Sequence, residues 1–298
     1  MIYLILAILC SSSIAMIFKI SEGRNLNRLA VTSFNYLCAS LVALFMLLVD
    51  FPELGVGGGS FESVVLKNET LFSLNSSVFW GISVGVFAGV FFFLSFLFYQ
   101  KSVRESGMSL SGAFGKLGIL IPMLFSLVIW REYPRILQWT GIAMALLSIL
   151  LLNWPFGRSG NGVKVSLILL FVSGGLAEFT NKLFQNYTVP GYKNVFLLSV
   201  FSSAFLISFL VLSKSRTQFK KREVLTGFLV GLPNLFSSFF LIAALESIKG
   251  SVAFPVYSAG SVALISFGGF VVFGEKLRRL EVFALAMVLL SLIMVNLS

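Results

Sequence analysis

Lys116 is the charged residue whose position in the chain most needs a chemical explanation. It lies in the apolar run "SGAFGKLGILIP", and the nearest charged residues are Glu105 and Arg131. A charge at mid-membrane costs about 2.5–3.5 kcal/mol on insertion scales, and a lysine reaches the surface only from near a helix end. If this run crosses a bilayer, Lys116 either binds the negative group of a ligand or is a structural lysine neutralised by a buried partner.

Glu178, in the run "GGLAEFTNK", is the acidic residue that suits Lys116 as a partner. This pair requires the two helices to be neighbours, and we expect that they are. Lys182 offers a local alternative, because residues four apart share one helix face. Glu178 could instead carry a proton, as acids do in the proton relays of carriers. A pair of Glu178 with either Lys116 or Lys182 yields a charged cavity.

The helix around Lys116 is rich in small residues. Gly112, Gly115 and Gly118 recur every three residues, and Pro122 follows one turn later. The glycines make room for a ligand or for close helix packing, and we expect Pro122 to free a backbone carbonyl that faces a cavity.

Several other polar residues inside apolar segments could form hydrogen bonds with a substrate, or could instead be helix-packing groups. We expect no catalytic residue and no metal ligand among them. The predicted substrate-binding set is Lys116, Glu178, Tyr257, Asn181, Lys182, Asn35, Gln100 and Asn234.

The composition indicates an integral membrane protein. The 298 residues are 57% hydrophobic and 11% charged, whereas a soluble domain carries about 25% charged residues. Cys10 and Cys38 fall inside apolar runs and suggest neither a disulfide nor a metal site. The net charge of +10 does not predict nucleic-acid binding, because the basic residues mostly lie in short connections between apolar segments. The chain lacks a phosphate-binding "G-x-x-x-x-G-K-[ST]" motif, and we expect no cofactor.

Ten apolar segments approach the roughly 20 residues that a spanning helix needs. The loop 50–77, with its "GVGGGS" run, reads as a flexible surface connection. The predicted fold is all-α, with spans at 2–19, 30–49, 78–99, 107–130, 136–153, 164–184, 193–212, 223–244, 251–273 and 280–297.

An internal repeat organises these segments. Residues 107–153 align with 250–296 without a gap, and polar identities carry the alignment: Glu132/Glu275, Arg135/Arg278 and Asn153/Asn296. The chain is therefore predicted to consist of two five-helix repeats, 1–153 and 164–298. Because five is odd, the second repeat enters the membrane from the opposite side. Inverted repeats of this kind commonly build transporters with a site at mid-membrane.

A corner motif between the last two helices of each repeat points to a family. Residues 273–277 read "FGEKL", and residues 130–133 read "WREY", which keeps the glutamate but lacks the glycine. The chain resembles the EamA-type proteins of the drug/metabolite transporter superfamily over essentially its whole length. The resemblance implies a ten-helix secondary carrier with a central cavity. In the small multidrug branch the coupling acid lies in the first helix of the unit. Glu178 lies in the first helix of the second repeat, but the residue aligned with it in the first repeat is Ala15.

The distribution of Lys and Arg predicts the orientation. The odd-numbered connections hold 15 of the 22 basic residues and the even-numbered ones hold six, the remaining one being Lys116. The positive-inside rule places the odd connections in the cytoplasm and both termini outside. We expect a multi-pass protein of the cell (inner) membrane.

The predicted function is secondary transport of a small anionic or zwitterionic metabolite by alternating access. The alternative is a proton-coupled exporter of cationic or drug-like compounds that uses Glu178. A membrane-embedded lipid transferase is remote, because the chain has no His and one Asp, Asp50, so we expect no enzyme activity. The expected partners are a small-molecule substrate and membrane lipids, with a homodimer left open and nucleic acid excluded.

Overall fold

The computed structural model describes residues 1–22, 26–50, 64, 72, 74–106, 108–152, 164–215, 218–274 and 279–296. Most of the predicted 50–77 loop lies outside the described residues. So do Gly107, Asn153 and the corner residues 275–278.

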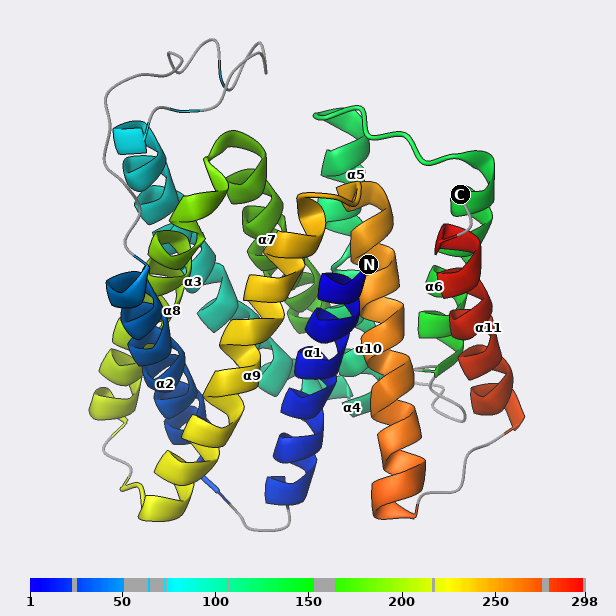
Figure 1. The fold of residues 1–298 in the computed structure, drawn as a ribbon. Coiled ribbons are helices and arrows are strands. Elements are labelled where there is room, and N and C mark those ends of the chain that lie inside the picture. The colour runs from blue at the N-terminus through cyan, green and yellow to red at the C-terminus, as the bar shows by residue number, and fades with distance from the viewer. Residues whose placement is uncertain are drawn as a thin grey trace. The chain divides into compact units, whose positions relative to one another are not determined.

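The described elements are helices (Figure 1), as the apolar composition predicts. The first half of the chain forms α1 (Ile2–Glu22), α2 (Arg28–Val49), α3 (Leu74–Ser106), α4 (Met108–Leu117), α5 (Leu120–Val128) and α6 (Ile136–Leu152). The second half forms α7 (Val165–Tyr187), the short 3₁₀ helix η2 (Pro190–Tyr192), α8 (Lys193–Lys214), α9 (Lys221–Leu245), α10 (Gly250–Phe273) and α11 (Arg279–Asn296).

Each of the ten predicted segments coincides with helical structure, and the fourth is divided into α4 and α5. Within the described residues, 7 helices are long and apolar enough to cross a membrane, and three shorter apolar helices accompany them. The chain is therefore an all-helical, multi-pass membrane protein. The count of ten spans and their inverted repeat stay predictions.

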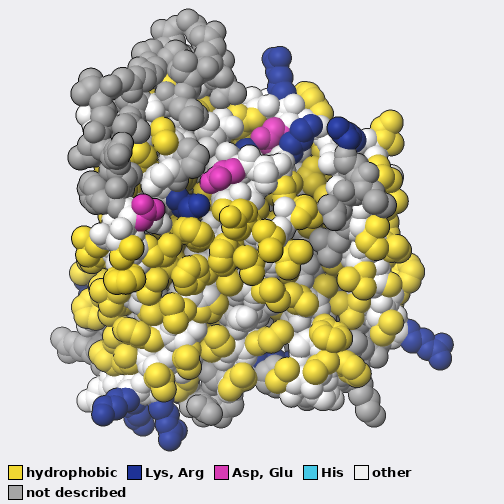
Figure 2. Space-filling view, viewed as in Figure 1, with side chains coloured by type: hydrophobic (Ala, Val, Ile, Leu, Met, Phe, Trp, Pro, Cys, Tyr) yellow, Lys and Arg dark blue, Asp and Glu magenta, His cyan; other side chains and the backbone are white. Residues whose placement is uncertain are grey.

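Apolar side chains cover most of the helix surface between the helix ends on the visible face, whereas Lys and Arg side chains gather toward the ends (Figure 2). Large exposed apolar residues include Phe45, Phe79 and Val128, which are 66%, 74% and 75% exposed. A bilayer removes such side chains from water, so this surface is the expected one for helices in lipid.

The chain forms two compact units. Unit 1 contains Met1–Met16, Leu94–Phe179 and Ala243–Ser298, and unit 2 contains Ile17–Phe93 and Thr180–Ile242. Each unit takes residues from both predicted repeats, so the spatial units are not the repeats. The repeat boundaries, 1–153 and 164–298, stay a prediction from the sequence.

Unit 1 is built around α10, which packs on α5, α6 and α11, while α6 also packs along α11 (Figure 1). Its buried core includes Ala145 and Ile149 of α6, Ala259 of α10 and Val288 of α11. The carboxylate of Glu132, between α5 and α6, accepts a hydrogen bond of 2.6 Å from the Gly250 N–H. This carboxylate therefore caps the positive N-terminal end of α10.

Unit 2 depends on close backbone contacts at glycines. α2 packs along α8, and Gly227 and Gly231 of α9 lie against the backbone of α2. Gly85 and Gly89 of α3 lie in the same way against α8. Small residues at helix interfaces allow this approach, which gives membrane helices van der Waals contact where lipid supplies no hydrophobic driving force.

The two corners that the repeat aligns share a backbone conformation. Gly274 ends α10 with φ of 64°, and Arg131, at the equivalent position after α5, has φ of 52°. Glycine adopts this left-handed conformation freely, whereas another residue loses roughly 1–2 kcal/mol in it. The first corner therefore keeps the geometry without the glycine.

Arg131→Gly is expected to stabilise the protein by up to about 1 kcal/mol, because it removes backbone strain at a positive φ. Gly274→Ala should have the opposite effect, since a Cβ there meets no neighbour and only the backbone conformation opposes it. Thermal unfolding in detergent measures both. A destabilised Arg131→Gly variant would show that the arginine side chain outweighs the strain.

Gly231→Val is expected to destabilise unit 2 by about 1–3 kcal/mol through overpacking. A Cβ on Gly231 would lie 2.6 Å from the Cys38 Cβ and 2.7 Å from the Asn35 carbonyl oxygen. Gly191→Ala is the control, because a Cβ there meets nothing within 4 Å. Equal melting temperatures for the two variants would contradict the packing explanation.

Candidate functional site

The helix that carries Lys116 is broken directly after it. α4 ends at Leu117 and α5 begins at Leu120. At the break the Ile119 N–H bonds to the Lys116 carbonyl oxygen at 3.4 Å, and the Ile121 N–H bonds to the Gly118 carbonyl oxygen at 3.0 Å. Each of these bonds joins residues three apart, in place of the usual α-helical bonds between residues four apart.

Pro122 does not leave its carbonyl partner unsatisfied. In a regular helix the residue at 122 would donate to the Gly118 carbonyl, and proline has no N–H to give. The Ile121 N–H takes that place, at 3.0 Å. The expectation that Pro122 frees a backbone carbonyl to face a cavity is therefore wrong for Gly118, because the tighter turn satisfies the group locally.

The broken segment lies against α7, as predicted. A Cβ on Gly118 would approach the Phe171 carbonyl oxygen to 2.8 Å and the Gly175 nitrogen to 3.0 Å, so both backbones meet at glycines. Further along, the rings of Phe125 and Phe179 lie 4.5 Å apart. The prediction that the segments holding Lys116 and Glu178 are neighbours is confirmed.

Lys116 and Glu178 both lie in unit 1 and are both partly buried. The Glu178 carboxylate acts electrostatically on the Lys116 ammonium group. In a low-dielectric surrounding, opposite charges at such positions attract far more strongly than they would in water. The two residues are therefore close enough for their charges to interact beside the helix break.

α10 supplies the third side of this region. Ser258 Oγ donates a hydrogen bond of 3.2 Å to the Lys116 carbonyl oxygen, and the neighbouring Tyr257 is 7% exposed. The sequence predicted Tyr257 as a substrate-binding residue and did not predict a role for Ser258. The position of Ser258 in "FPVYSAG" could have indicated such a role. A serine inside a helix, however, usually bonds to its own helix backbone, as Ser261 does to the Tyr257 carbonyl.

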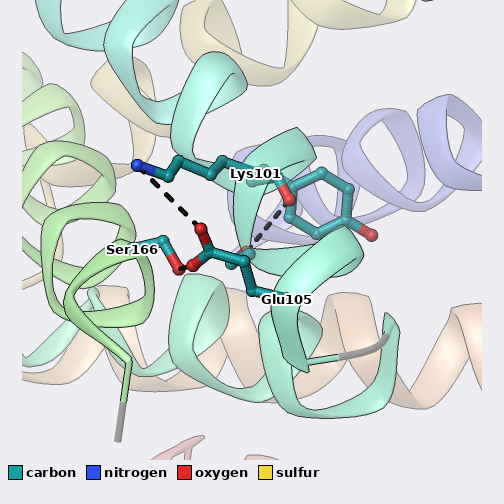
Figure 3. A network of polar contacts seen from close by, with 5 residues as sticks. Lys101, Glu105 and Ser166 are labelled. Carbon is teal, nitrogen blue, oxygen red and sulfur yellow. Dashed lines mark hydrogen bonds and ion pairs between the residues drawn. The ribbon is translucent and has the colours of Figure 1, made fainter.

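Gln100 lies near the end of α3, also in unit 1, and its Nε2 is buried with no hydrogen-bond partner among the described residues. The residues after it form a polar network (Figure 3). Lys101 and Glu105 are an ion pair at 3.9 Å, and Ser166 Oγ of α7 donates to Glu105 at 2.6 Å. This network joins the end of α3 to the start of α7 and does not include Gln100.

The other four predicted residues lie in unit 2. Asn234 Nδ2 of α9 donates to Asn35 Oδ1 of α2 at 3.1 Å, so these two amides, predicted separately, form one interhelical bond. Lys182 is 3% exposed and donates to Gln185 Oε1 at 3.0 Å, and Asn181 is 1% exposed. In the described residues no three of His, Cys, Asp and Glu lie together as a metal site would require.

Comparison with known proteins gives a partial family match, a relative of similar length and a solved structure of similar fold. Residues 206–288 match the sequence model of the family described as "Small Multidrug Resistance protein". An uncharacterized protein of Haemophilus influenzae is 27% identical over 284 residues, which is 93% of this chain and 91% of the relative. A solved structure described as "Crystal structure of protein" covers 99% of this chain and 96% of its own, with a TM-score of 0.71 and 14% identity.

The match to the small multidrug resistance family suggests a membrane transporter. The matched segment covers the end of α8, α9, α10 and part of α11, and Glu178 lies outside it. The solved structure shows a shared fold. We therefore describe the chain as a multi-helix membrane protein.

The Asn35–Asn234 bond predicts a measurable coupling between α2 and α9. In a double-mutant cycle with Asn35→Ala and Asn234→Ala, we expect an interaction energy of about 0.6 kcal/mol, the average for hydrogen bonds between membrane helices. Unfolding of the four proteins in detergent measures it. Additive effects of the two substitutions would show that the bond contributes nothing to stability.

Proposed function

We propose that this protein is a secondary transporter that moves a small anionic or zwitterionic metabolite by alternating access. Its ten helices would form two inverted five-helix repeats, with the substrate site around Lys116. The observation that carries the proposal is a partly buried lysine at a break in an apolar helix, electrostatically paired with Glu178 on a neighbouring helix.

A broken membrane helix is suited to anion binding. The N-terminus of α5 carries the positive end of a helix dipole, and it begins four residues after Lys116. Transporters bind anionic substrate groups at such half-helix N-termini. The negative C-terminal end of α4 lies beside this N-terminus, and the Ile119 and Ile121 N–H groups are already bonded, so in this proposal the Lys116 charge supplies most of the attraction for an anionic group.

Glu178 has two roles in this proposal. Without substrate, its carboxylate would neutralise Lys116, and with substrate it would bind an ammonium group or a proton. Tyr257 of α10 and the abundant phenylalanines would form the walls. Asn35, Gln100, Asn181, Lys182 and Asn234 stay candidates for polar contacts at other stages of the transport cycle.

A proton-coupled exporter of cationic or drug-like compounds is the second candidate. The match of residues 206–288 to the small multidrug resistance family favours it. Glu178 would then bind the cation and the proton alternately. Its position beside Lys116 weighs against this function, because a neighbouring positive charge disfavours a cationic ligand.

We further propose that the protein lies in the cell (inner) membrane with its odd-numbered connections in the cytoplasm and both termini outside. The bias of Lys and Arg supports this orientation.

A thermal-shift screen of the full chain in detergent tests the proposed substrate class. The panel contains amino acids, organic acids, sugar phosphates, nucleotide sugars and lipophilic cations. A ligand at 100 times its Kd adds about 2.7 kcal/mol of stability. We expect an anionic or zwitterionic compound to stabilise the wild type and Lys221→Gln, which removes an exposed lysine at the start of α9, but not Lys116→Gln.

A second pattern would contradict the leading function. If only cations raise the melting temperature, and Lys116→Gln still responds, Lys116 is a structural counter-ion. Loss of that response in Glu178→Gln would then establish Glu178 as the binding residue and favour the exporter.

A further inference from the structure

Unit 2 contains a pocket that is separate from all eight predicted site residues. It has a volume of about 310 Å³ and is lined by Phe45, Met46, Val49, Asp50, Gly191, Lys193, Asn194 and Phe239. This volume is at the lower end of the range for small-molecule sites, roughly 300–1,000 Å³. The pocket lies where the C-terminal end of α2 meets η2 and the N-terminal end of α8.

Each of the two charged residues of this pocket lies at a helix end whose partial charge has the same sign as the residue. Asp50 is the C-cap of α2, whose C-terminus carries partial negative charge, and Lys193 is the first residue of α8, whose N-terminus carries partial positive charge. Neither position stabilises its own helix. Each charge instead adds to the partial charge of its helix end, so the pocket lining has a negative group at one helix end and a positive group at the other.

Asn194 adds a polar group that the protein leaves unsatisfied. Its side chain is 7% exposed, and its Oδ1 is buried with no hydrogen-bond partner among the described residues. An unpartnered buried acceptor is unfavourable, and natural proteins retain few of them. Because this oxygen is closed to water, a ligand with an N–H or O–H donor would satisfy it only after the Asn194 side chain turns toward the pocket.

The remaining walls are apolar and partly face the exterior. Phe45 and Val49 are 66% and 71% exposed, and the Lys193 ammonium lies 4.2 Å from the centre of the Phe239 ring. Because α2 ends here, the pocket has an apolar flank on the membrane-spanning side and charged groups at the helix ends. The end of a membrane-spanning helix lies near the polar headgroups of a bilayer.

We propose that this pocket binds a zwitterion, with its anionic group at Lys193 and the α8 N-terminus and its ammonium group at Asp50. A phospholipid headgroup with a phosphate and an ammonium has this chemistry, and so does a free solute of the same kind. The site does not depend on the transport function proposed for Lys116.

The test measures the apparent melting temperature of the full chain in detergent micelles. The probes are phosphatidylethanolamine, soluble glycerophosphoethanolamine and phosphatidylglycerol, which lacks the ammonium group. We expect a zwitterionic probe to raise the melting temperature by about 2 °C or more, because binding to the native state stabilises it. A shift with the lipid alone identifies a headgroup site, and a shift with the soluble probe as well identifies a site for free solutes.

Matched variants separate this site from general effects of lipid. Lys193→Gln and Asp50→Asn should lose the shift, whereas Lys221→Gln and Glu246→Gln, at exposed positions at the ends of α9, should keep it. Lys116→Gln should also keep it, so this proposal and the proposed function can fail independently. Asn194→Leu should lose the shift without lowering the melting temperature of the ligand-free protein.

Three results would overturn the proposal. The first is an equal shift with phosphatidylglycerol, which would mean that the ammonium group is not recognised. The second is a shift that survives in both Lys193→Gln and Asp50→Asn. The third is the absence of a shift with every probe.

Discussion

The structure depends on one constraint: a helix interrupted inside a membrane must have its freed backbone groups satisfied by protein. Lipid offers no hydrogen bonds, and each unsatisfied group costs several kcal/mol. At the break after Lys116, the Ile121 N–H satisfies the Gly118 carbonyl, and Ser258 of α10 bonds to the Lys116 carbonyl. The irregular backbone is therefore satisfied partly by its own tighter turn and partly by α10, with α7 packed against it.

The same constraint explains the corners that the repeat aligns. Glu132 caps α10 by accepting the Gly250 N–H, and Arg131 takes a left-handed conformation to direct the chain there. The repeat pairs Glu132 with Glu275 and Gly250 with Gly107, so the sequence contains the partners for a second capping interaction of this kind. Among the matched polar residues, Glu132 is thus explained by helix capping.

The sequence predicted the elements well and the contacts only in part. Apolar length is a local property, so all ten segments coincide with helices. The fourth was predicted as a single span, 107–130, and the structure divides it between Leu117 and Leu120. The approach of the Lys116 segment to α7 was predicted correctly, since two buried charges of opposite sign favour neighbouring helices. The Asn35–Asn234 bond joins residues that are 199 positions apart, and no local pattern could have paired them.

The pocket at the end of α2 shows more clearly what the sequence alone could not predict. Asp50 was interpreted as a loop residue and Lys193 as a topology signal, because each follows or precedes an apolar run. Only the meeting of α2 with α8 gives them a common site. Charges at helix ends have a meaning that depends on which other helix end lies opposite, and the sequence does not contain that information locally.

The burial of α10 has a consequence for how the protein is made. Every described side chain from Ser251 to Val262 is buried, and α7 and α10 are the two least apolar of the seven candidate spans. Such a helix gains little from lipid alone during synthesis and gains most from protein neighbours. α5 and α6 precede α10 in the chain, but α11 follows it, so the surroundings of α10 are complete only when the last helix has left the ribosome. Biogenesis of this protein is therefore expected to finish by assembly of helices already in the membrane, with the Lys116 region among the last parts to form.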